Sequence, residues 1–324
     1  MPSTPTDSSS LIIATRVSEL ALRQARQVQH ALAARGVAST LKTYRTTGDK
    51  RLDEPLNAIG GKGLFTQELE HDLARGKVQL CVHSLKDLPT EMPPGLEIIA
   101  RLPREDPRDA LVVNAVTGAS SLAELPRGSR VGTSSLRRRS QLLAARPDLE
   151  VVELRGNVPT RVKKVDGGQV HAAILAAAGL HRLGISEHIA CYLDAPAWLP
   201  AAGQGAIAVQ IRSDDERMRE WLAPLDDPET ALQVRAERAF LGALEGGCQV
   251  PIGALVVGDG SARVLHGFIA DVQGRRVVRG SHSIEAENPE LGGIRLANEL
   301  RGAGASEILA ALRSVHRIPS PQPE

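Results

Sequence analysis

A hydroxyl, an ammonium group and a carboxylate lie close together in the sequence, at the point where an apolar run ends. Ser84, Lys86 and Asp87 follow Leu80-Cys81-Val82, a pattern typical of a buried strand. Open α/β sheets bind their ligands at such strand ends. A carboxylate held there could stabilise a cation or transfer a proton, although the same residues alone are also compatible with a solvated loop.

Basic residues recur at other predicted strand ends. They are Arg16, Lys62, Arg155 and, one helical turn further on, Arg161. Each alone is compatible with a solvated surface, but strand ends converge in such folds, so the set favours an anion-binding cleft. Guanidinium groups pair bidentately with carboxylates, and the sequence has no Gly-x-x-x-x-Gly-Lys-Ser/Thr loop for a nucleotide. A ligand with several carboxylates is therefore expected.

Residues 132–139 add a further place for an anion. Thr133, Ser134 and Ser135 offer hydroxyls and backbone N–H groups where a helix begins. Arg137 and Arg138 lie in the first turn of that helix, where they oppose its dipole. We therefore expect an anion to lie over them.

Cys248 lies in Glu245-Gly246-Gly247-Cys248-Gln249, where two glycines allow a sharp turn that could present the thiol outward. The alternative is a small buried hydrophobic residue, which is also the interpretation of Cys81 and Cys191. The three cysteines are far apart and without Cys-x-x-Cys spacing, and the histidines show no metal-ligand spacing. Neither a disulfide framework nor a metal site is expected.

Composition narrows the class of protein. The 324 residues carry a formal charge of +1, and aromatic residues make up 2%. Few aromatic rings and no net positive field argue against nucleic-acid binding. No apolar run approaches the roughly 18 residues that span a bilayer, and residues 1–10 do not form a secretory signal. A cytoplasmic protein without membrane contact is expected, acting as a monomer.

Hydrophobic periodicity predicts two successive α/β units followed by a smaller one. The first unit has strands at 11–14, 37–44 and before Lys86, and helices at 19–35 and 64–75. The second has strands at 110–113, 130–131, 150–154 and 171–175, and helices at 135–145 and 158–165. Residues 206–211 are predicted to return as a strand to the first sheet, which gives two crossings and a hinge.

We therefore predict an α/β protein with two bilobal periplasmic-binding-protein-like α/β domains and a small α+β C-terminal domain. The expected limits are 10–103 with 204–223 for domain 1, 108–200 for domain 2 and 228–318 for domain 3. Domain 1 carries Asp87, domain 2 carries many of the basic residues, and domain 3 carries Cys248.

At this point seven segments together resemble one known family, the porphobilinogen deaminases (hydroxymethylbilane synthases). The segments are Ala14-Thr15-Arg16, Gly60-Gly61-Lys62-Gly63-Leu64-Phe65, Val82-His83-Ser84-Leu85-Lys86-Asp87, Gly132-Thr133-Ser134-Ser135-Leu136-Arg137-Arg138, Leu154-Arg155-Gly156-Asn157, Gly203-Gln204-Gly205 and Leu244-Glu245-Gly246-Gly247-Cys248-Gln249-Val250-Pro251. They occur in the family's order over about residues 11–255, and the match is weak from about Val256 onward.

The resemblance implies a transferase of tetrapyrrole and heme synthesis. It would join four porphobilinogen molecules head to tail on a dipyrromethane cofactor held by Cys248 through a thioether, with loss of ammonia and final hydrolysis to hydroxymethylbilane. Asp87 would be catalytic. The other cofactor-binding positions implied are Ser84, Lys86, Thr133, Ser134, Ser135, Arg137, Arg138, Arg155 and Gly156. The substrate-binding positions implied are Arg16, Ser18, Lys62, Phe65, Arg161, Arg182, Gln204 and Gly205.

Several residues depart from the family pattern. Ala58 replaces a lysine, Leu111 replaces a phenylalanine and Pro159 replaces a glycine. Glu19 and Arg23 replace the commoner proline and tryptophan. These departures bear on ligand geometry and rate. The rival hypothesis is a non-catalytic bilobal anion-binding or effector-sensing protein, which the two α/β units and the basic cleft also permit.

Overall fold

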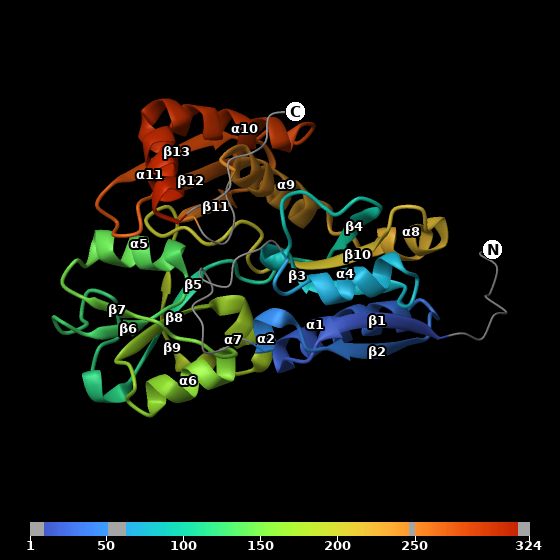
Figure 1. The fold of residues 1–324 in the computed structure, drawn as a ribbon, viewed down its shortest axis with the longest axis horizontal. Coiled ribbons are helices and arrows are strands. Elements are labelled where there is room, and N and C mark those ends of the chain that lie inside the picture. The colour runs from blue at the N-terminus through green and yellow to red at the C-terminus, as the bar shows by residue number, and fades with distance from the viewer. Residues whose placement is uncertain (1–9, 51–62, 246–249, 317–324) are drawn as a thin grey trace.

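The computed structural model describes residues 10–50, 63–245 and 250–316, and Figure 1 shows their arrangement. Two five-stranded sheets and one three-stranded sheet each carry their own helices. We call residues 11–101 with 207–222 lobe 1, residues 109–193 lobe 2 and residues 228–316 the C-terminal unit, within the described ranges. In Figure 1 the C-terminal unit lies above the junction of the two lobes.

Lobe 1 is built on a mixed sheet of order β2-β1-β3-β10-β4. Its strands are β1 (Leu11–Arg16), β2 (Ser39–Tyr44), β3 (Leu80–Ser84), β4 (Leu96–Arg101) and β10 (Ile207–Arg212). Its helices are α1 (Glu19–Ala33), α2 (Thr47–Lys50), α4 (Gln67–Ala74) and α8 (Glu216–Leu222), with the 3-10 turns η1 (Leu85–Asp87) and, just beyond, η4 (Ala223–Leu225). Strand β10 runs antiparallel to both β3 and β4, so the predicted return to the first sheet is confirmed.

Lobe 2 repeats this topology with the order β7-β6-β8-β5-β9. Its strands are β5 (Asp109–Val113), β6 (Arg130–Gly132), β7 (Glu150–Val152), β8 (Ala172–Ala176) and β9 (Ile189–Leu193). Its helices are α5 (Leu136–Ala145), α6 (Val158–Asp166) and α7 (Ala177–Leu183), with the turns η2 (Ala115–Thr117) and η3 (Ser186–His188). Strand β5 runs antiparallel to its neighbours β8 and β9. It takes the place in this sheet that β10 takes between β3 and β4 in lobe 1.

The C-terminal unit is an antiparallel sheet of order β11-β12-β13 with helices packed on it. Its elements are α9 (Pro228–Ala243), β11 (Ile252–Val257), η5 (Gly260–Ala262), β12 (Val264–Ala270), β13 (Val277–Ser283), α10 (Pro289–Leu300), the π-helical turn η6 (Arg301–Ala305) and α11 (Ser306–His316). The fold class expected from the sequence is confirmed. The domain limits given above stay a prediction.

Local sequence explains why the helices near the lobe junction begin where they do. Ser18, Ser135 and Asn157 each accept a backbone N–H from the first turn of α1, α5 and α6, respectively. Pro159 lies in the first turn of α6, where a missing N–H costs nothing, so this departure from the family pattern is compatible with the helix. The strand ends and helix N-termini are thereby fixed around the junction of the lobes.

Five elements differ from the sequence expectation. Strands β4 and β9 and helices α2, α7 and α8 were not predicted. Cys81 is buried as expected, whereas Cys191, in β9, is only partly buried. Prolines at 93, 94, 103 and 107 lie before and after β4, which belongs to the lobe 1 sheet. Within the described ranges, residues 102–108 and 194–206 are the segments that cross between the lobes.

Candidate active site between the lobes

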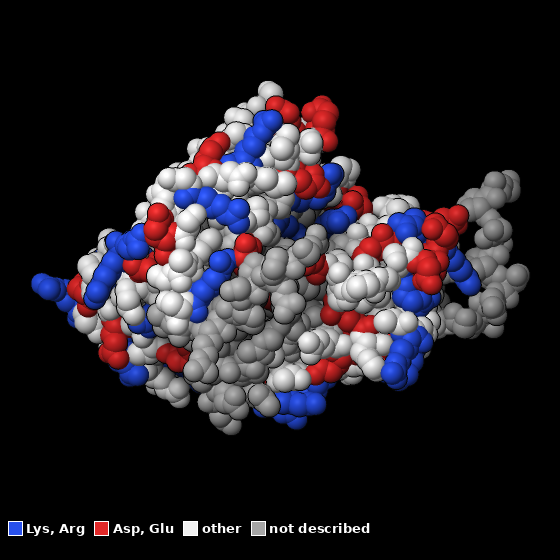
Figure 2. Space-filling view, turned by 45° about the horizontal axis from the view of Figure 1, so that its top comes forward, with Lys and Arg blue, Asp and Glu red and all other residues white. Residues whose placement is uncertain are grey.

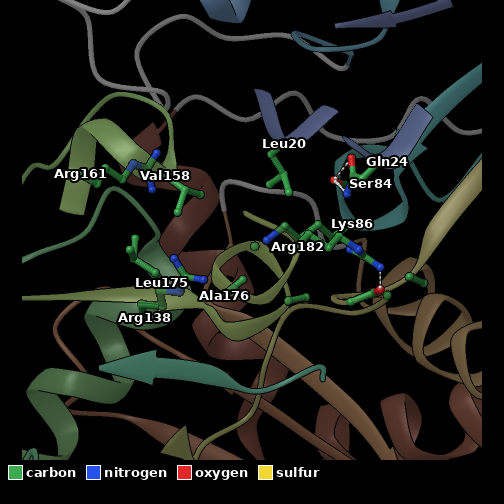
Figure 3. Close-up of a pocket in the computed structure, with 15 residues that line it drawn as sticks. Leu20, Gln24, Ser84, Lys86, Arg138, Val158, Arg161, Leu175, Ala176 and Arg182 are labelled. Atoms are coloured by element: carbon green, nitrogen blue, oxygen red, sulfur yellow. Dashed lines mark hydrogen bonds between the residues drawn. The ribbon is translucent and has the colours of Figure 1, made fainter. Parts of the chain in front are cut away.

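A pocket lies between the two lobes, and Figure 3 shows the side chains that line it. Lobe 1 and the second crossing contribute Leu20, Gln24, Ser84, Lys86, Gly203, Gly205 and Ala206. Lobe 2 contributes Arg138, Val158, Arg161, Leu175, Ala176, Ala178, Gly179 and Arg182. Six of the residues predicted for the site meet here: Ser84, Lys86, Arg138, Arg161, Arg182 and Gly205. Four of these six are cationic.

Lys86 projects from η1 at the end of β3. Its Nζ donates to Oε1 of Gln204 over 3.2 Å, and neighbouring Ser84 accepts from Nε2 of Gln24 over 2.8 Å. Burial, together with the charge of Arg138, lowers the pKa of Lys86 to about 8. An ammonium group in this environment is stabilised by a bound anion.

Arg161 and Arg182 bring further positive charge from lobe 2. Nε of Arg161 donates to the carbonyl of Gly156 over 2.8 Å, and Nη2 of Arg182 donates to the carbonyl of Gly205 over 2.7 Å. Burial lowers the pKa of each guanidinium to about 10, and for Arg161 the charges of Arg138 and Arg155 add to the effect. Within the described residues, the buried Nε of Arg182 has no hydrogen-bond partner. These features fit a polycarboxylate ligand.

Arg137 and Arg138 are bound to an internal carboxylate, Asp109, the first residue of β5. Arg137 donates to its Oδ2 over 2.6 Å and Arg138 to its Oδ1 over 2.7 Å. Burial would raise the pKa of Asp109, but the two guanidinium charges outweigh it and hold that pKa well below its ordinary value. The anion expected over these arginines is thus at least in part the protein's own. Arg138 lines the pocket, whereas Arg137 instead donates its second bond to the carbonyl of Leu199.

A second group of charges surrounds Asp87 at the ends of β1 and β3. Nη1 of Arg16 lies 3.7 Å from Oδ2 of Asp87, while the rest of the Arg16 guanidinium pairs with Asp49 of α2. The ring of Phe65 stacks on Arg16, with its centroid 4.2 Å from the guanidinium carbon. Asp87 is also close enough to raise the pKa of Arg161 in lobe 2, although burial keeps that pKa low overall. The one ion pair that Asp87 makes among the described residues is thus with Arg16 of its own lobe.

The predicted hydroxyl and amide positions mostly make internal bonds. Ser18 and Ser135 cap helices, Thr133 accepts from the N–H of Ser135 over 3.2 Å, and Ser134 donates to the carbonyl of Leu154 over 2.8 Å. Gly156 has φ +114°, and a Cβ there would lie 2.8 Å from Cγ2 of Thr160, which explains the glycine. Arg155 follows β7, half-buried. Cys248, Lys62 and Ala58 lie outside the described residues, so their predicted roles stay predictions.

Two family models match the chain. Residues 11–220 match "Porphobilinogen deaminase, dipyromethane cofactor binding domain", and residues 231–302 match "Porphobilinogen deaminase, C-terminal domain". The chain belongs to the porphobilinogen deaminase family. The resemblance drawn from the motifs is confirmed, with the enzyme class and the dipyrromethane cofactor. The second family model also covers residues after Val256, where the sequence motifs showed only weak resemblance to the family.

Curated relatives cover nearly the whole chain. The chain is 50% identical to "Porphobilinogen deaminase" of Moorella thermoacetica over 93% of its length and 96% of that protein. It is 48% identical to the protein of the same name from Syntrophotalea carbinolica, over 94% of this chain and 96% of that protein. Among solved structures it is similar to a nutrient-binding protein from Burkholderia cenocepacia bound to methionine. The sequence identity is 12% and the TM-score is 0.42, and the similarity covers 68% of this chain and 93% of that protein.

Sequence reasoning missed three residues that hold the site together: Gln24, Asp49 and Asp109. Gln24 gave a signal, because it interrupts the apolar face of α1 and lies buried beside Ala25 and Val28. Asp49 and Asp109 gave none, because their partners are distant in sequence. Within the described ranges, no group of at least three His, Cys, Asp or Glu side chains could hold a metal ion. No helix described combines the length and apolar character that a membrane crossing needs.

Proposed function

We propose that this protein joins four porphobilinogen molecules head to tail on a dipyrromethane group held at Cys248, releasing ammonia at each addition and hydroxymethylbilane by final hydrolysis. The observation that supports this best is the convergence of Lys86, Arg138, Arg161 and Arg182 on one pocket between the lobes. The family implies that each added pyrrole ring brings two carboxylates, so the reaction needs many cations in one place. The protein as a whole is nearly neutral, with a formal charge of +1, so these cations are concentrated at the pocket.

The residues present fit the cofactor. Its carboxylates would be held by Lys86, Arg138 and Arg155, with Ser84 and the hydroxyls of residues 133–135 beside them. The unsatisfied Nε of Arg182, within the described part of the chain, and the low pKa of buried Lys86 both indicate a binding site for anions. When bound, the dipyrromethane supplies the pyrrole carbon to which the first substrate is joined.

Arg16, Ser18, Lys62, Phe65, Arg161, Arg182, Gln204 and Gly205 would bind the incoming substrate. Asp87 would hold its carboxylate beside the substrate ring as the amino group is protonated and leaves as ammonia. Loss of ammonia leaves positive charge on that ring, and a fixed carboxylate stabilises positive charge best where solvent is excluded. Arg16, at 3.7 Å, keeps Asp87 oriented while Asp49 holds most of the Arg16 guanidinium.

Intact-mass spectrometry with a porphobilinogen assay tests this proposal. The purified protein should be heavier than its sequence mass by two linked pyrrole units on Cys248, and it should consume porphobilinogen with release of ammonia. The Cys248→Ser variant should lack both properties. Active protein with an unmodified Cys248, or a protein that binds porphobilinogen without consuming it, would contradict the proposal. The second outcome would support a non-catalytic binding protein.

We further propose that the protein acts as a monomer in the cytoplasm, without nucleic acid or membrane. On the face in Figure 2, basic and acidic side chains are interspersed, without a large area of one sign. Sedimentation at two protein concentrations would test the oligomeric state, and a concentration-dependent increase in mass would contradict it.

A further inference from the structure

Arg238 of α9 binds a segment of lobe 1 that directly follows Asp87. Its Nη1 donates to the carbonyl of Leu88 over 3.3 Å, and its Nη2 donates to the carbonyls of Pro89 and Thr90 over 2.5 Å and 3.2 Å. Burial lowers the pKa of this guanidinium to about 10. One side chain from the C-terminal unit thus accounts for three carbonyls of the segment.

The contact is part of a wider helix face. Val234, one turn before Arg238, packs in one apolar cluster with Leu85 and Leu88, which flank Asp87. Gly242, one turn after Arg238, has Thr90 directly beside it: a Cβ on Gly242 would lie 3.6 Å from Cβ of Thr90. The same face of α9 therefore contacts the Asp87 turn along its length.

The same helix leads to the cofactor cysteine. α9 ends at Ala243, and Cys248 follows a few residues later in the sequence. We propose that Arg238 is a positioning residue, which fixes the turn bearing Asp87 against the helix that precedes Cys248. This inference rests on the proposed function. It assigns Arg238 no contact with substrate or cofactor.

The neighbouring Glu237 has a different role in the same helix. Its carboxylate accepts from Arg104 over 2.7 Å and 2.9 Å and from the N–H of Gly203 over 2.8 Å, so it holds the two crossings between the lobes. Arg238 contacts neither crossing by any hydrogen bond that the described residues make. A change at Arg238 is therefore expected to act on the Asp87 turn and leave the hinge in place.

The test compares Arg238→Met, which keeps the aliphatic stem, with Arg238→Lys and with Arg235→Met. Arg235 is the matched control, because it is exposed on the same helix and pairs with Glu290 inside the C-terminal unit. Per mole of adduct-bearing protein, Arg238→Met should lower kcat by about 10- to 100-fold with KM within about twofold, since a misplacement of roughly 1 Å is enough. Arg238→Lys should recover part of the loss, and Arg235→Met should equal wild type.

Hydrogen exchange gives a readout independent of turnover. In Arg238→Met, with or without adduct, the peptide covering residues 84–92 should exchange faster, because the Leu88 N–H bond to the Leu85 carbonyl loses its support. Peptides from β1 should not change. Wild-type kcat in adduct-bearing Arg238→Met, an increase in KM alone, or unchanged exchange over 84–92 would each overturn the inference. Inactive wild-type protein would instead overturn the proposed function. The hydrogen-exchange result would then still test whether Arg238 stabilises residues 84–92.

Discussion

Lys86 and Asp109 lie in different lobes and are joined through one side-chain amide. Lys86 donates to Oε1 of Gln204 over 3.2 Å, and Nε2 of Gln204 donates to Oδ1 of Asp109 over 2.9 Å. Asp109 in turn binds Arg137, Arg138 and the indole N–H of Trp198. One cation on each wall of the pocket, Lys86 and Arg138, is therefore oriented through one buried carboxylate.

The Asp109→Asn variant should be strongly destabilised, because it leaves two buried guanidinium groups without their counter-charge. Removing one partner of a buried ion pair costs about 3–5 kcal/mol. The control is Asp194→Asn, whose carboxylate is 70% exposed and should change the free energy of unfolding by less than about 1 kcal/mol. Urea unfolding measures both, and equal effects would contradict the role given to Asp109.

The Asp87→Asn variant should keep its fold and its cofactor adduct while losing most turnover. The Asp87 side chain is 30% exposed and has one ion pair among the described residues, so little folding energy depends on it. Removing one group that stabilises charge in the transition state typically lowers kcat by about 10²- to 10³-fold. The exposed neighbour Glu91, as Glu91→Gln, should behave as wild type. Wild-type turnover by Asp87→Asn would remove Asp87 from the mechanism.

Binding of the cofactor's carboxylates should weaken above about pH 8, because Lys86, with a pKa of about 8, is charged below that pH and neutral above it. Cofactor-free protein incubated with porphobilinogen should therefore acquire its adduct more slowly at about pH 9 than at about pH 7, as measured by intact mass. In Lys86→Arg the two rates should differ less, since a guanidinium stays charged, and in Lys86→Met both rates should be low. If the two rates differ as much in Lys86→Arg as in wild type, another group causes the pH dependence.

The Gly205→Ala variant should be far less stable than Gly95→Ala. Both glycines have positive φ, +89° and +80°, so both substitutions introduce similar backbone strain. A Cβ at Gly205 would lie 2.2 Å from the carbonyl oxygen of Glu105, whereas nothing lies within 4 Å at Gly95. We expect a difference of about 2 kcal/mol or more in the free energy of unfolding. Comparable losses of stability in the two variants would mean that Gly205 and Glu105, which lie in different crossings, can move apart without a cost in free energy.

Strong local periodicity is what the sequence could predict. Helix α1 has a capping serine, an inward apolar face and a glycine stop, and its expected start was correct. Helix α7 was missed because it follows β8 without any polar break, so residues 172–180 form one apolar run across both elements. Strand β4 was missed because it is short and has prolines both before and after it. Short elements inside apolar or proline-rich sequence carry too little pattern of their own.

For the site, strand ends and a helix start indicated Arg161 and Arg138, and the family resemblance added Arg182, but none of these gave the partners of the residues. All three do line the pocket. That Arg137 and Arg138 share Asp109 could not be predicted, because the pairing depends on how β5 packs against α5. The family motifs supplied the roles of single residues, which local chemistry leaves open.

Strand β10 lies between β3 and β4 and pairs with both. The ribosome delivers β4 well before β10, so the sheet of lobe 1 stays in two pieces until residues 207–212 have been synthesised. Lobe 2 has all five of its strands within residues 109–193, and it can close as soon as that stretch emerges. The basic wall of lobe 2 can therefore form before the sheet that carries Asp87 is complete.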